Sequence, residues 1–437
     1  MIRKTVLELL IRIIEKKEPC HIVLGQALGK LSELPEKDRA LIKLLVYGVL
    51  ERKIMIDRII EELSSRPINK IKPIVRNILR IGIYQLAFTD VPDHAAVYES
   101  VALANKGPAA PFKSFINANL RSFQRRSGYF MNEYPASLEQ DEKLSYEYSM
   151  PLWITRMWIG RFGALKTEEI LKAFLEPHGL PIRINISKAK EEDVIASLTS
   201  KGIKAEKSSL CDNAYILYDC PAPHLVEEFE KGLFTVQDAA CALSGQMIGL
   251  SGNENVLDIC AAPGGKTMNA ADIMLARAAG IEEVGHVTAC DISRNKTDLI
   301  NENVSRCGFD NISVMINDAT VYNEKFEDQF DVVICDLPCS GLGIIGKKPD
   351  IRYNASTEGI RELSQLQRNI LMNAFRYVKN GGKLLYSTCT LTEEENEGNC
   401  GFIEKTGMFE PVTQRTIIPG TYGADGFFMS LFVKKCP

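Results

Sequence analysis

Hydrophobic residues recur at two different spacings along this 437-residue chain. Over residues 1–126 they lie three and four positions apart, as in the stretch 6–13, which is the spacing of an amphipathic helix. Helix breakers interrupt this pattern at Pro19, Pro67, Pro92 and the pair Gly107-Pro108. We therefore expect a bundle of six or seven helices at the front of the chain.

The pattern changes after the bundle. Residues 127–145 mix Ser, Gly, Asn, Pro and acidic residues with weak periodicity, which is typical of a linker. Beyond it, helical spacing at 153–162, 168–175 and 191–201 alternates with strand-like runs at 181–186 and 215–218. These elements predict a small α+β unit, in which the sequence shows no chemistry.

From residue 240 onward, short apolar runs alternate regularly with amphipathic stretches, which predicts a largely parallel sheet. The candidate strands are 255–260, 286–291, 312–318, 330–336 and 382–388, and the candidate helices lie near 266–278, 294–306 and 358–378. The predicted fold class is thus multidomain, with an all-α bundle, a small α+β middle unit and an α/β Rossmann-like domain. The predicted limits are 1–130 for the bundle, 131–145 for the linker, 146–235 for the middle unit and 236–437 for the α/β domain.

Composition agrees with several soluble domains. The hydrophobic share of 45% and the charged share of 25% are ordinary for globular proteins, and no run of 18 apolar residues predicts a membrane span. The first ten residues carry charge inside their apolar stretch, so we expect a helix and no signal peptide. The twelve cysteines form no Cys-x-x-Cys pair and the five histidines are scattered. We therefore expect no metal site, no disulfide framework and a reducing, cytoplasmic location.

Charge is distributed unevenly along the chain. Residues 1–126 carry 22 Lys and Arg against 13 Asp and Glu, a net +9, while the remainder carries 30 against 43, a net −13. A basic module joined to an acidic one predicts that the first binds a polyanion. The alternative is a solvated helical surface that is basic without function.

The stretch Asn255–Lys266 is the centre of the candidate site. It reads as a buried strand that stops at Ala-Ala-Pro-Gly-Gly and continues into a helix. A strand, a glycine turn and a helix open a nucleotide-binding β-α-β unit, where a ligand meets exposed backbone N–H groups. The dinucleotide spacing Gly-x-Gly-x-x-Gly is absent, and on its own the stretch also fits an ordinary tight turn.

Three candidate strands end in, or run straight into, an acid: Asp291, Asp318 and Asp336. In an open α/β sheet ligands bind at the carboxyl ends of strands, so these acids and the glycine turn should meet at one crevice. Asp291 ends the second strand, where an acid can accept both hydroxyls of a ribose. A single strand-end Asp is more often a helix cap, but three beside a glycine turn favour a site.

Two cysteines belong to the same rim of the sheet. Cys339 follows the fourth strand in Asp-Leu-Pro-Cys-Ser-Gly, and Cys389 follows the fifth in Ser-Thr-Cys-Thr. A cysteine within a strand is usually a small buried hydrophobe, which is our interpretation of Cys260, Cys290 and Cys335. Cys339 and Cys389 stand in loops beside polar residues, where that interpretation fits poorly.

Taken in order, Cys-Ala-Ala-Pro-Gly-Gly-Lys, Asp-x-Pro-Cys-Ser-Gly-x-Gly and Ser-Thr-Cys-Thr resemble the motifs of S-adenosylmethionine-dependent RNA 5-methylcytosine methyltransferases. The segments 78–86 and 91–106 resemble a NusB-type RNA-binding domain, and the helix over 112–126 ends in an arginine cluster suited to phosphates. Together these likenesses cover nearly the whole chain and narrow the resemblance to the bacterial RsmB type.

The resemblance implies methylation of a specific 16S ribosomal RNA cytosine at carbon 5. It implies that Cys389 is the nucleophile and that Cys339 assists product release. It also implies that S-adenosylmethionine is held by Cys260, Ala261, Ala262, Pro263, Gly264, Gly265, Lys266, Asp291, Asp318 and Asp336. The expected partner is 16S rRNA, naked or in an early small-subunit particle, and the expected state is a monomer.

Alternatives remain open at this point. DNA cytosine methyltransferases use the Pro-Cys cysteine and the RNA family uses the Thr-Cys one, so chemistry alone does not choose between Cys339 and Cys389. A methyltransferase acting on exocyclic amines should carry an Asp/Asn-Pro-Pro-Tyr loop after the fourth strand, and Asp-Leu-Pro-Cys stands there. A non-catalytic RNA-binding protein would bind RNA without transferring methyl groups. Lys347, Lys348, Arg352 and Tyr353 are candidate RNA contacts or a solvated loop.

Overall fold

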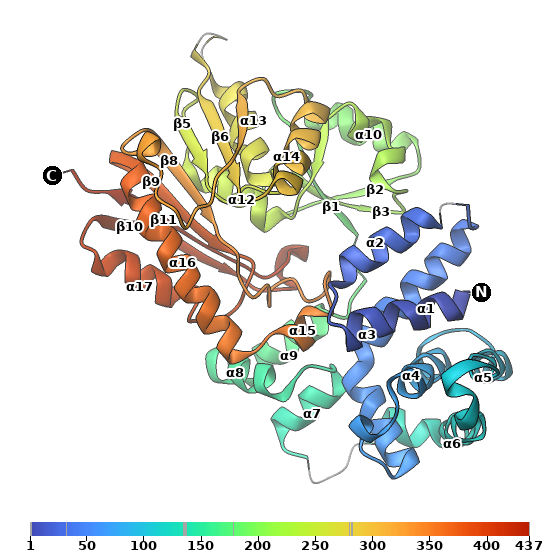
Figure 1. Cartoon of the computed structure of the whole chain (residues 1–437). Helices are drawn as coiled ribbons and strands as arrows, with labels where there is room; N and C mark the ends of the chain where they lie inside the picture. Colours follow the sequence, from blue (N-terminus) through green and yellow to red (C-terminus); the bar gives the residue numbers. More distant parts are fainter. Residues whose placement is uncertain are drawn as a thin grey trace. The chain divides into compact units, whose positions relative to one another are not determined.

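The computed structural model describes residues 2–31, 33–133, 138–177, 179–278, 280 and 283–436. The chain divides into two compact units, the first made of residues 1–176 and 345–354, the second of residues 177–344 and 355–437 (Figure 1). The chain first crosses from one unit to the other between residues 176 and 177, inside the stretch 146–235 that was predicted as one small domain. The predicted domain limits stay predictions. Among the described residues, no helix combines the length and the apolar character needed to cross a bilayer.

In the described part of the first unit, all elements of regular secondary structure are helices. They are α1 (Ile2–Leu10), the π-helix η1 (Ile11–Glu15), α2 (Cys20–Lys30), α3 (Glu36–Ser64), η2 (Ile68–Lys70), α4 (Pro73–Phe88), α5 (Asp93–Ala102), η3 (Gly107–Phe112), α6 (Lys113–Asn132), α7 (Gln140–Glu147), α8 (Leu152–Phe162), α9 (Ala164–Ala173) and α15 (Ile351–Asn354). Pro73 opens α4 at the first helical position, where proline lacks only an N–H that would be unpaired anyway. The predicted bundle of six or seven helices is confirmed as α1 to α6, whose buried Val, Leu and Ile residues share one core.

The linker predicted over 131–145 is only partly a linker. Residues 131–132 end α6 and residues 140–145 lie in α7, while residues 134–137 lie outside the described residues. Leu144 and Tyr146 of α7 are buried. These few apolar side chains fix the helix by packing, which a weakly periodic sequence does not reveal.

The second unit begins with a small antiparallel sheet in the order β2-β3-β1-β4. Its elements are β1 (Leu180–Ile184), α10 (Glu191–Ser200), β2 (Lys204–Lys207), β3 (Ala214–Tyr218), η4 (Pro223–Leu225), α11 (Glu227–Glu230) and β4 (Phe234–Val236). Val194 and Leu198 of α10 pack on the buried face of this sheet. The sequence predicted β1, β3 and α10 but missed β2 and β4, which are only four and three residues long.

The larger sheet of the second unit has the order β10-β11-β9-β8-β5-β6-β7. Its elements are α12 (Ala239–Ile248), β5 (Asn255–Asp258), α13 (Gly265–Arg277), β6 (His286–Asp291), α14 (Arg294–Cys307), β7 (Ile312–Ile316), η6 (Glu324–Phe326), β8 (Phe330–Asp336), α16 (Thr357–Tyr377), β9 (Val378–Thr388), α17 (Glu397–Lys405), β10 (Phe409–Ile417), η7 (Thr421–Gly423) and β11 (Phe427–Lys434). β5 to β9 pair in parallel, as predicted, whereas β10 and β11 are antiparallel. The sheet is therefore mixed.

Helices cover both faces of this sheet (Figure 1). Val333 and Cys335 of β8 face the core formed with α16 and α17, while Val332 and Ile334 face the core formed with α12 and α13. A strand buried on both faces has no polar alternation, which is why its sequence is a continuous apolar run.

Candidate active site

The site lies where the order of the parallel strands reverses. From β5 the chain moves outward through β6 and β7, then returns to β8 on the other side of β5. The loops after β5 and β8 must therefore leave the sheet in opposite directions, which opens a crevice at their carboxyl ends. The glycine turn, the strand-end acids and the two loop cysteines all follow these strands, as the sequence predicted.

The turn after β5 opens the N-terminus of α13. Gly264 has a φ of +104°, a backbone conformation that favours glycine, and it precedes Gly265, the first residue of the 13-residue helix. A Cβ atom at Gly265 would lie 3.3 Å from the side-chain nitrogen of Gln237, and one at Gly264 would contact Ile300. The two glycines thus keep open a cradle of backbone N–H groups that suits a ligand with anionic groups.

Asp291 and Asp336 are held by this turn. Asp291 is buried, accepts hydrogen bonds from the N–H groups of Ala262 (3.0 Å) and Ile292 (2.8 Å), and pairs with Lys296 at 3.0 Å. The Lys266 ammonium lies 2.7 Å from Asp336, which also accepts a 2.8 Å bond from the Ser387 hydroxyl. Asp336 therefore links α13 to the ends of β8 and β9.

Asp318 lies two residues beyond β7. Its carboxylate accepts hydrogen bonds from the backbone N–H (2.9 Å) and the hydroxyl (2.7 Å) of Thr320. These bonds hold the pKa of Asp318 below its usual range, so it is a carboxylate at neutral pH. It stands at the same end of the sheet as Asp291, whose backbone carbonyl accepts a bond from Asn317.

Asp258, the last residue of β5, is a site residue that our sequence analysis did not single out. It is buried, and one carboxylate oxygen accepts the Thr267 hydroxyl at 2.7 Å while the other has no partner. Burial raises its pKa to about 7. Its position in the sequence could have indicated it, because Asp258 is an acid at the end of the apolar run that predicts β5.

Cys339 and Cys389 face each other, with their sulfur atoms 3.4 Å apart. They follow adjacent parallel strands in which Asp336 and Ser387 are partners, so the register brings both loops to the same height. The contact with Cys389, together with burial, raises the pKa of the Cys339 thiol well above its usual value. Either sulfur can be the donor in this contact, and the raised pKa favours the protonated form of Cys339.

A buried polar network supports both cysteine loops. Glu395 accepts hydrogen bonds from the Ser340 N–H (2.8 Å), the Thr392 hydroxyl (2.8 Å) and the Gln367 amide (3.2 Å). Ser340 also shares a hydrogen bond with Thr390 at 2.7 Å, which joins the residues that follow the two cysteines. Nothing in the sequence indicates this network, because Ser340 and Glu395 are 55 positions apart.

Of the three cysteines interpreted as small buried hydrophobes, two fit that interpretation fully and Cys260 fits it in part. Cys290 and Cys335 are fully buried, and burial raises the pKa of each thiol, as it does for the partly buried Cys260. All twelve cysteines are free thiols. In the part of the chain that the structure describes, no group of three or more His, Cys, Asp or Glu side chains is arranged to hold a metal.

The interpretation of Arg352 as a candidate RNA contact is wrong, while Lys347 and Lys348 remain candidates. Arg352 of α15 is buried within the first unit, where its Nη1 atom donates to the carbonyls of Glu51, Tyr148 and Ser149, whereas Tyr353 is half-buried. The Tyr353 hydroxyl donates to the carbonyl of Leu50. Arg352 is therefore directed into the protein, although its Nε and Nη2 atoms have no partner there, and the Tyr353 hydroxyl is engaged by the backbone.

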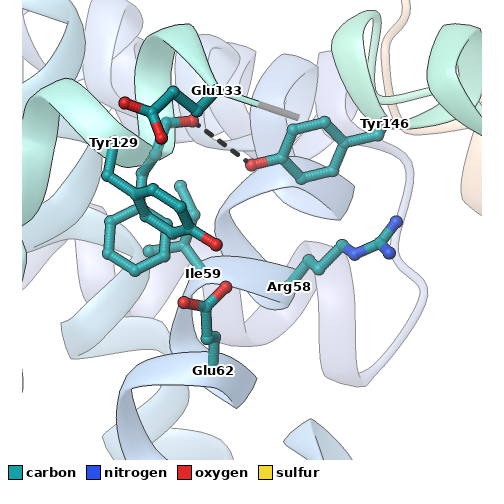
Figure 2. Close-up of a pocket in the computed structure, with 7 residues that line it drawn as sticks. Arg58, Ile59, Glu62, Tyr129, Glu133 and Tyr146 are labelled. Carbon is teal, nitrogen blue, oxygen red and sulfur yellow. Dashed lines mark hydrogen bonds between the residues drawn. The ribbon is translucent and has the colours of Figure 1, made fainter. Parts of the chain in front are cut away.

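The arginine cluster of α6 is partly engaged within the first unit. Arg126 pairs with Glu62 at 2.7 Å and stacks on Tyr129 and Phe130. Figure 2 shows the hollow beside it, which Arg58 and Glu62 of α3 line together with Tyr129 and Tyr146. At about 20 Å³ this hollow has room for one water and none for a cofactor. Arg125 is exposed and keeps its predicted role as a candidate phosphate contact.

The fold and the crevice define a Rossmann-like methyltransferase domain preceded by a ferredoxin-like unit and a NusB-type helical domain. Family models match each part: the NusB family over residues 1–125, the ferredoxin-like domain of RsmF/B-like methyltransferases over 150–221, and 16S rRNA methyltransferase RsmB/F over 246–433. The predicted fold class is thereby confirmed.

Relatives match over the whole length. The chain is 32% identical over 456 residues to the probable ribosomal RNA small subunit methyltransferase B of Bacillus subtilis (strain 168), covering 99% of both chains. It is 32% identical over 425 residues to ribosomal RNA small subunit methyltransferase B of Proteus mirabilis (strain HI4320), covering 94% of this chain and 96% of that one. The chain therefore belongs to the ribosomal RNA small subunit methyltransferase B family, as its motifs predicted.

Solved structures agree in fold. The crystal structure of PH0851 has a TM-score of 0.79 and 25% identity, covering 99% of this chain and 98% of that one. NSun6 from Pyrococcus horikoshii with SFG, a ligand that is an analogue of S-adenosylmethionine, has a TM-score of 0.56 and 20% identity, covering 64% of this chain and 97% of that one.

Proposed function

We propose that this chain transfers a methyl group from S-adenosylmethionine to carbon 5 of one cytosine in 16S ribosomal RNA, through a covalent bond to Cys389. The observation that carries this proposal is the pair of thiols 3.4 Å apart at the carboxyl ends of β8 and β9, beside the glycine turn. Family membership supports a methyl transfer to small-subunit rRNA. The cysteine pair supports the particular atom and the covalent route.

The crevice fits S-adenosylmethionine, whose sulfonium supplies an electrophilic methyl group. The cradle of residues 260–266 presents backbone N–H groups, and each carboxylate has lone pairs beyond the bonds described above. In this proposal Asp291 accepts the ribose hydroxyls, and Asp318 and Asp336 line the remaining walls. Cys260 to Lys266 form the floor.

Carbon 5 of cytosine is too weak a nucleophile to take a methyl group unaided. A Cys389 thiolate forms a bond to carbon 6, which makes carbon 5 electron-rich like an enamine. Carbon 5 then bonds to the methyl carbon as the sulfur–methyl bond of the donor breaks. A base removes the carbon 5 proton, and the electrons of that C–H bond restore the ring double bond and expel the Cys389 thiolate. The target cytosine must be unpaired or flipped out to reach the pocket.

The two thiols differ in their environments, which favours Cys389 as the nucleophile. In this proposal Cys339 stays protonated, in line with its raised pKa, and its thiol at 3.4 Å donates to the attacking sulfur of Cys389. Cys339 then assists when the covalent bond to carbon 6 is broken.

The first test measures transfer of labelled methyl groups from S-adenosylmethionine to protein-free 16S RNA, followed by bisulfite sequencing. One protected cytosine is expected. Incorporation of label without bisulfite protection would mean that another atom is methylated, and the covalent mechanism would fall. If naked RNA takes no label, the same assay is run on small-subunit particles, and no transfer there either would overturn the proposal.

The second test separates the roles of the two cysteines. Cys389→Ala should abolish transfer, because no thiolate is left to activate carbon 5. Cys339→Ala should leave enzyme bound covalently to RNA, visible as a slow band on a denaturing gel. A stable adduct with Cys389→Ala and none with Cys339→Ala would reverse the assignment.

A further inference from the structure

Gln237 carries a buried amide group with one half unpaired. The side chain is 7% exposed, and its Oε1 atom accepts a 2.7 Å hydrogen bond from Arg183 Nε. This bond identifies the other amide atom as nitrogen, and that Nε2 atom has no partner. A buried N–H group without an acceptor is rare in folded proteins, because desolvation removes its bond to water without a replacement.

The unpaired nitrogen is directed at the start of α13. It lies 3.3 Å from the position that a Cβ atom of Gly265 would take. The first N–H groups of a helix have no partner within the helix, and Gly264 offers no side chain to cap them. The unpaired side-chain nitrogen therefore lies beside the first turn of α13, at the positive end of the helix dipole, an environment that suits an anion.

Gln237 is held in place by a buried ion pair that includes the same helix. Arg183 is fully buried and donates at 2.7 Å to Asp272 of α13, which is also fully buried. Asp272 further accepts the N–H groups of Ile186 (3.0 Å) and Ser187 (2.9 Å). The amide of Gln237 is thus fixed, through Arg183, relative to the helix whose N-terminus it faces.

We propose that Gln237 is a cofactor-binding residue whose Nε2 group donates a hydrogen bond to the carboxylate of S-adenosylmethionine. This inference rests on the proposed function, since it requires that the crevice binds that cofactor. The carboxylate is the one anionic group of the cofactor. The ammonium and sulfonium groups are cations that this donor would repel, and the ribose hydroxyls have an acceptor in Asp291.

The decisive variant is Gln237→Glu, because it keeps the shape and the oxygen that accepts from Arg183 while it replaces the donor by a second oxygen. Binding is measured by titration calorimetry with two ligands, S-adenosylhomocysteine and 5′-methylthioadenosine, the second of which lacks the carboxylate. The variant should bind S-adenosylhomocysteine roughly 10- to 100-fold more weakly, as expected for losing one hydrogen bond to a charged group. Binding of 5′-methylthioadenosine should change less than twofold.

Gln365→Glu is the matched control, because it makes the same change of charge on an exposed position of α16 and should leave both affinities as they are. If the wild-type chain binds neither ligand, the proposed function fails and the inference fails with it. If the wild-type chain binds S-adenosylhomocysteine and Gln237→Glu binds it equally well, the inference is overturned while the function stands.

Equal weakening of both ligands in Gln237→Glu would also overturn the inference, because it would show that the residue acts on the shape of the crevice. Should Gln237→Glu not fold, Gln237→Met takes its place, since it has a similar length and no donor. Selective loss of S-adenosylhomocysteine binding is again the expected result, and equal affinity for this ligand would refute the proposal.

Discussion

Asp272→Leu should destabilise the second unit more than most substitutions of its buried residues. Both side chains of the Arg183–Asp272 pair are fully buried, and Asp272 accepts four hydrogen bonds, from Arg183, from the N–H groups of Ile186 and Ser187, and from the Ser187 hydroxyl. Removing one member of such a pair leaves an uncompensated buried charge and costs about 3–5 kcal/mol. Domains of this kind are stable by about 5–15 kcal/mol, so the loss is a large fraction.

Hydrogen exchange measured peptide by peptide is the appropriate assay, because it reports β1 and α13 separately. A loss of about 4 kcal/mol corresponds to exchange on the order of 1000-fold faster in the protected amides of these two elements. Trp153 and Trp158, the two tryptophans of the chain, both lie in α8 of the first unit. Their fluorescence serves as an internal check that the first unit is intact.

The double variant Arg183→Met with Asp272→Leu tests the cause. It replaces the whole pair by apolar side chains and leaves no charge behind, so it should recover most of the lost stability. Exchange in Asp272→Leu within threefold of wild type would refute the reasoning. A double variant as unstable as the single one would show that the four hydrogen bonds, and not the unpaired charge, carry the energy.

Three further predictions concern the active-site loops. Buried Asp258 has a pKa of about 7, against an ordinary value of 3.8, so the free energy of unfolding should fall by about 4 kcal/mol as the pH rises from about 4 to 7. Asp258→Asn should remove this fall, which urea unfolding at several pH values measures. An equal fall in the wild-type chain and the variant would contradict the prediction. Gly343→Ala should slow methyl transfer at least about tenfold, because its Cβ atom would overlap the backbone of Gly426 and lie 2.8 Å from the carbonyl oxygen of Cys389. Gly401→Ala meets nothing within 4 Å and should be neutral. Glu395→Gln should slow single-turnover transfer by about 100-fold with cofactor affinity unchanged, and wild-type rates would show that the network is dispensable.

Local pattern was enough to predict most of the fold. The glycine turn, the five parallel strands and the helices between them follow from apolar runs and breakers that lie within a few residues of each other. The edge strand β10 escaped because most of its side chains are exposed and polar, so it lacks the period that marks a buried strand. Its strand conformation follows from pairing with β11, an apolar run that was not among the predicted strands either.

The candidate site, like the fold, could be predicted from the sequence only in part. The acids and cysteines could be predicted because each directly follows a strand, and parallel strands end at one edge. Gln237 and Glu395 could not, because their significance lies in what they contact: Arg183 is 54 positions from Gln237, and Ser340 is 55 positions from Glu395. Arg352 was misassigned for the same reason, since its charge suggested RNA while its actual partners are backbone carbonyls.

The choice between two chemically identical thiols shows what the structure adds to the sequence. Cys339 and Cys389 have the same side chain, and their strands place them at the same height, so position alone does not distinguish them. The 3.4 Å contact, in which either sulfur can donate, raises the pKa of Cys339 together with burial. A donor that keeps its proton favours negative charge on its neighbour, and negative charge on sulfur is what an attack on carbon 6 requires. The division of roles in the proposed reaction thus rests on the difference between the environments of the two thiols.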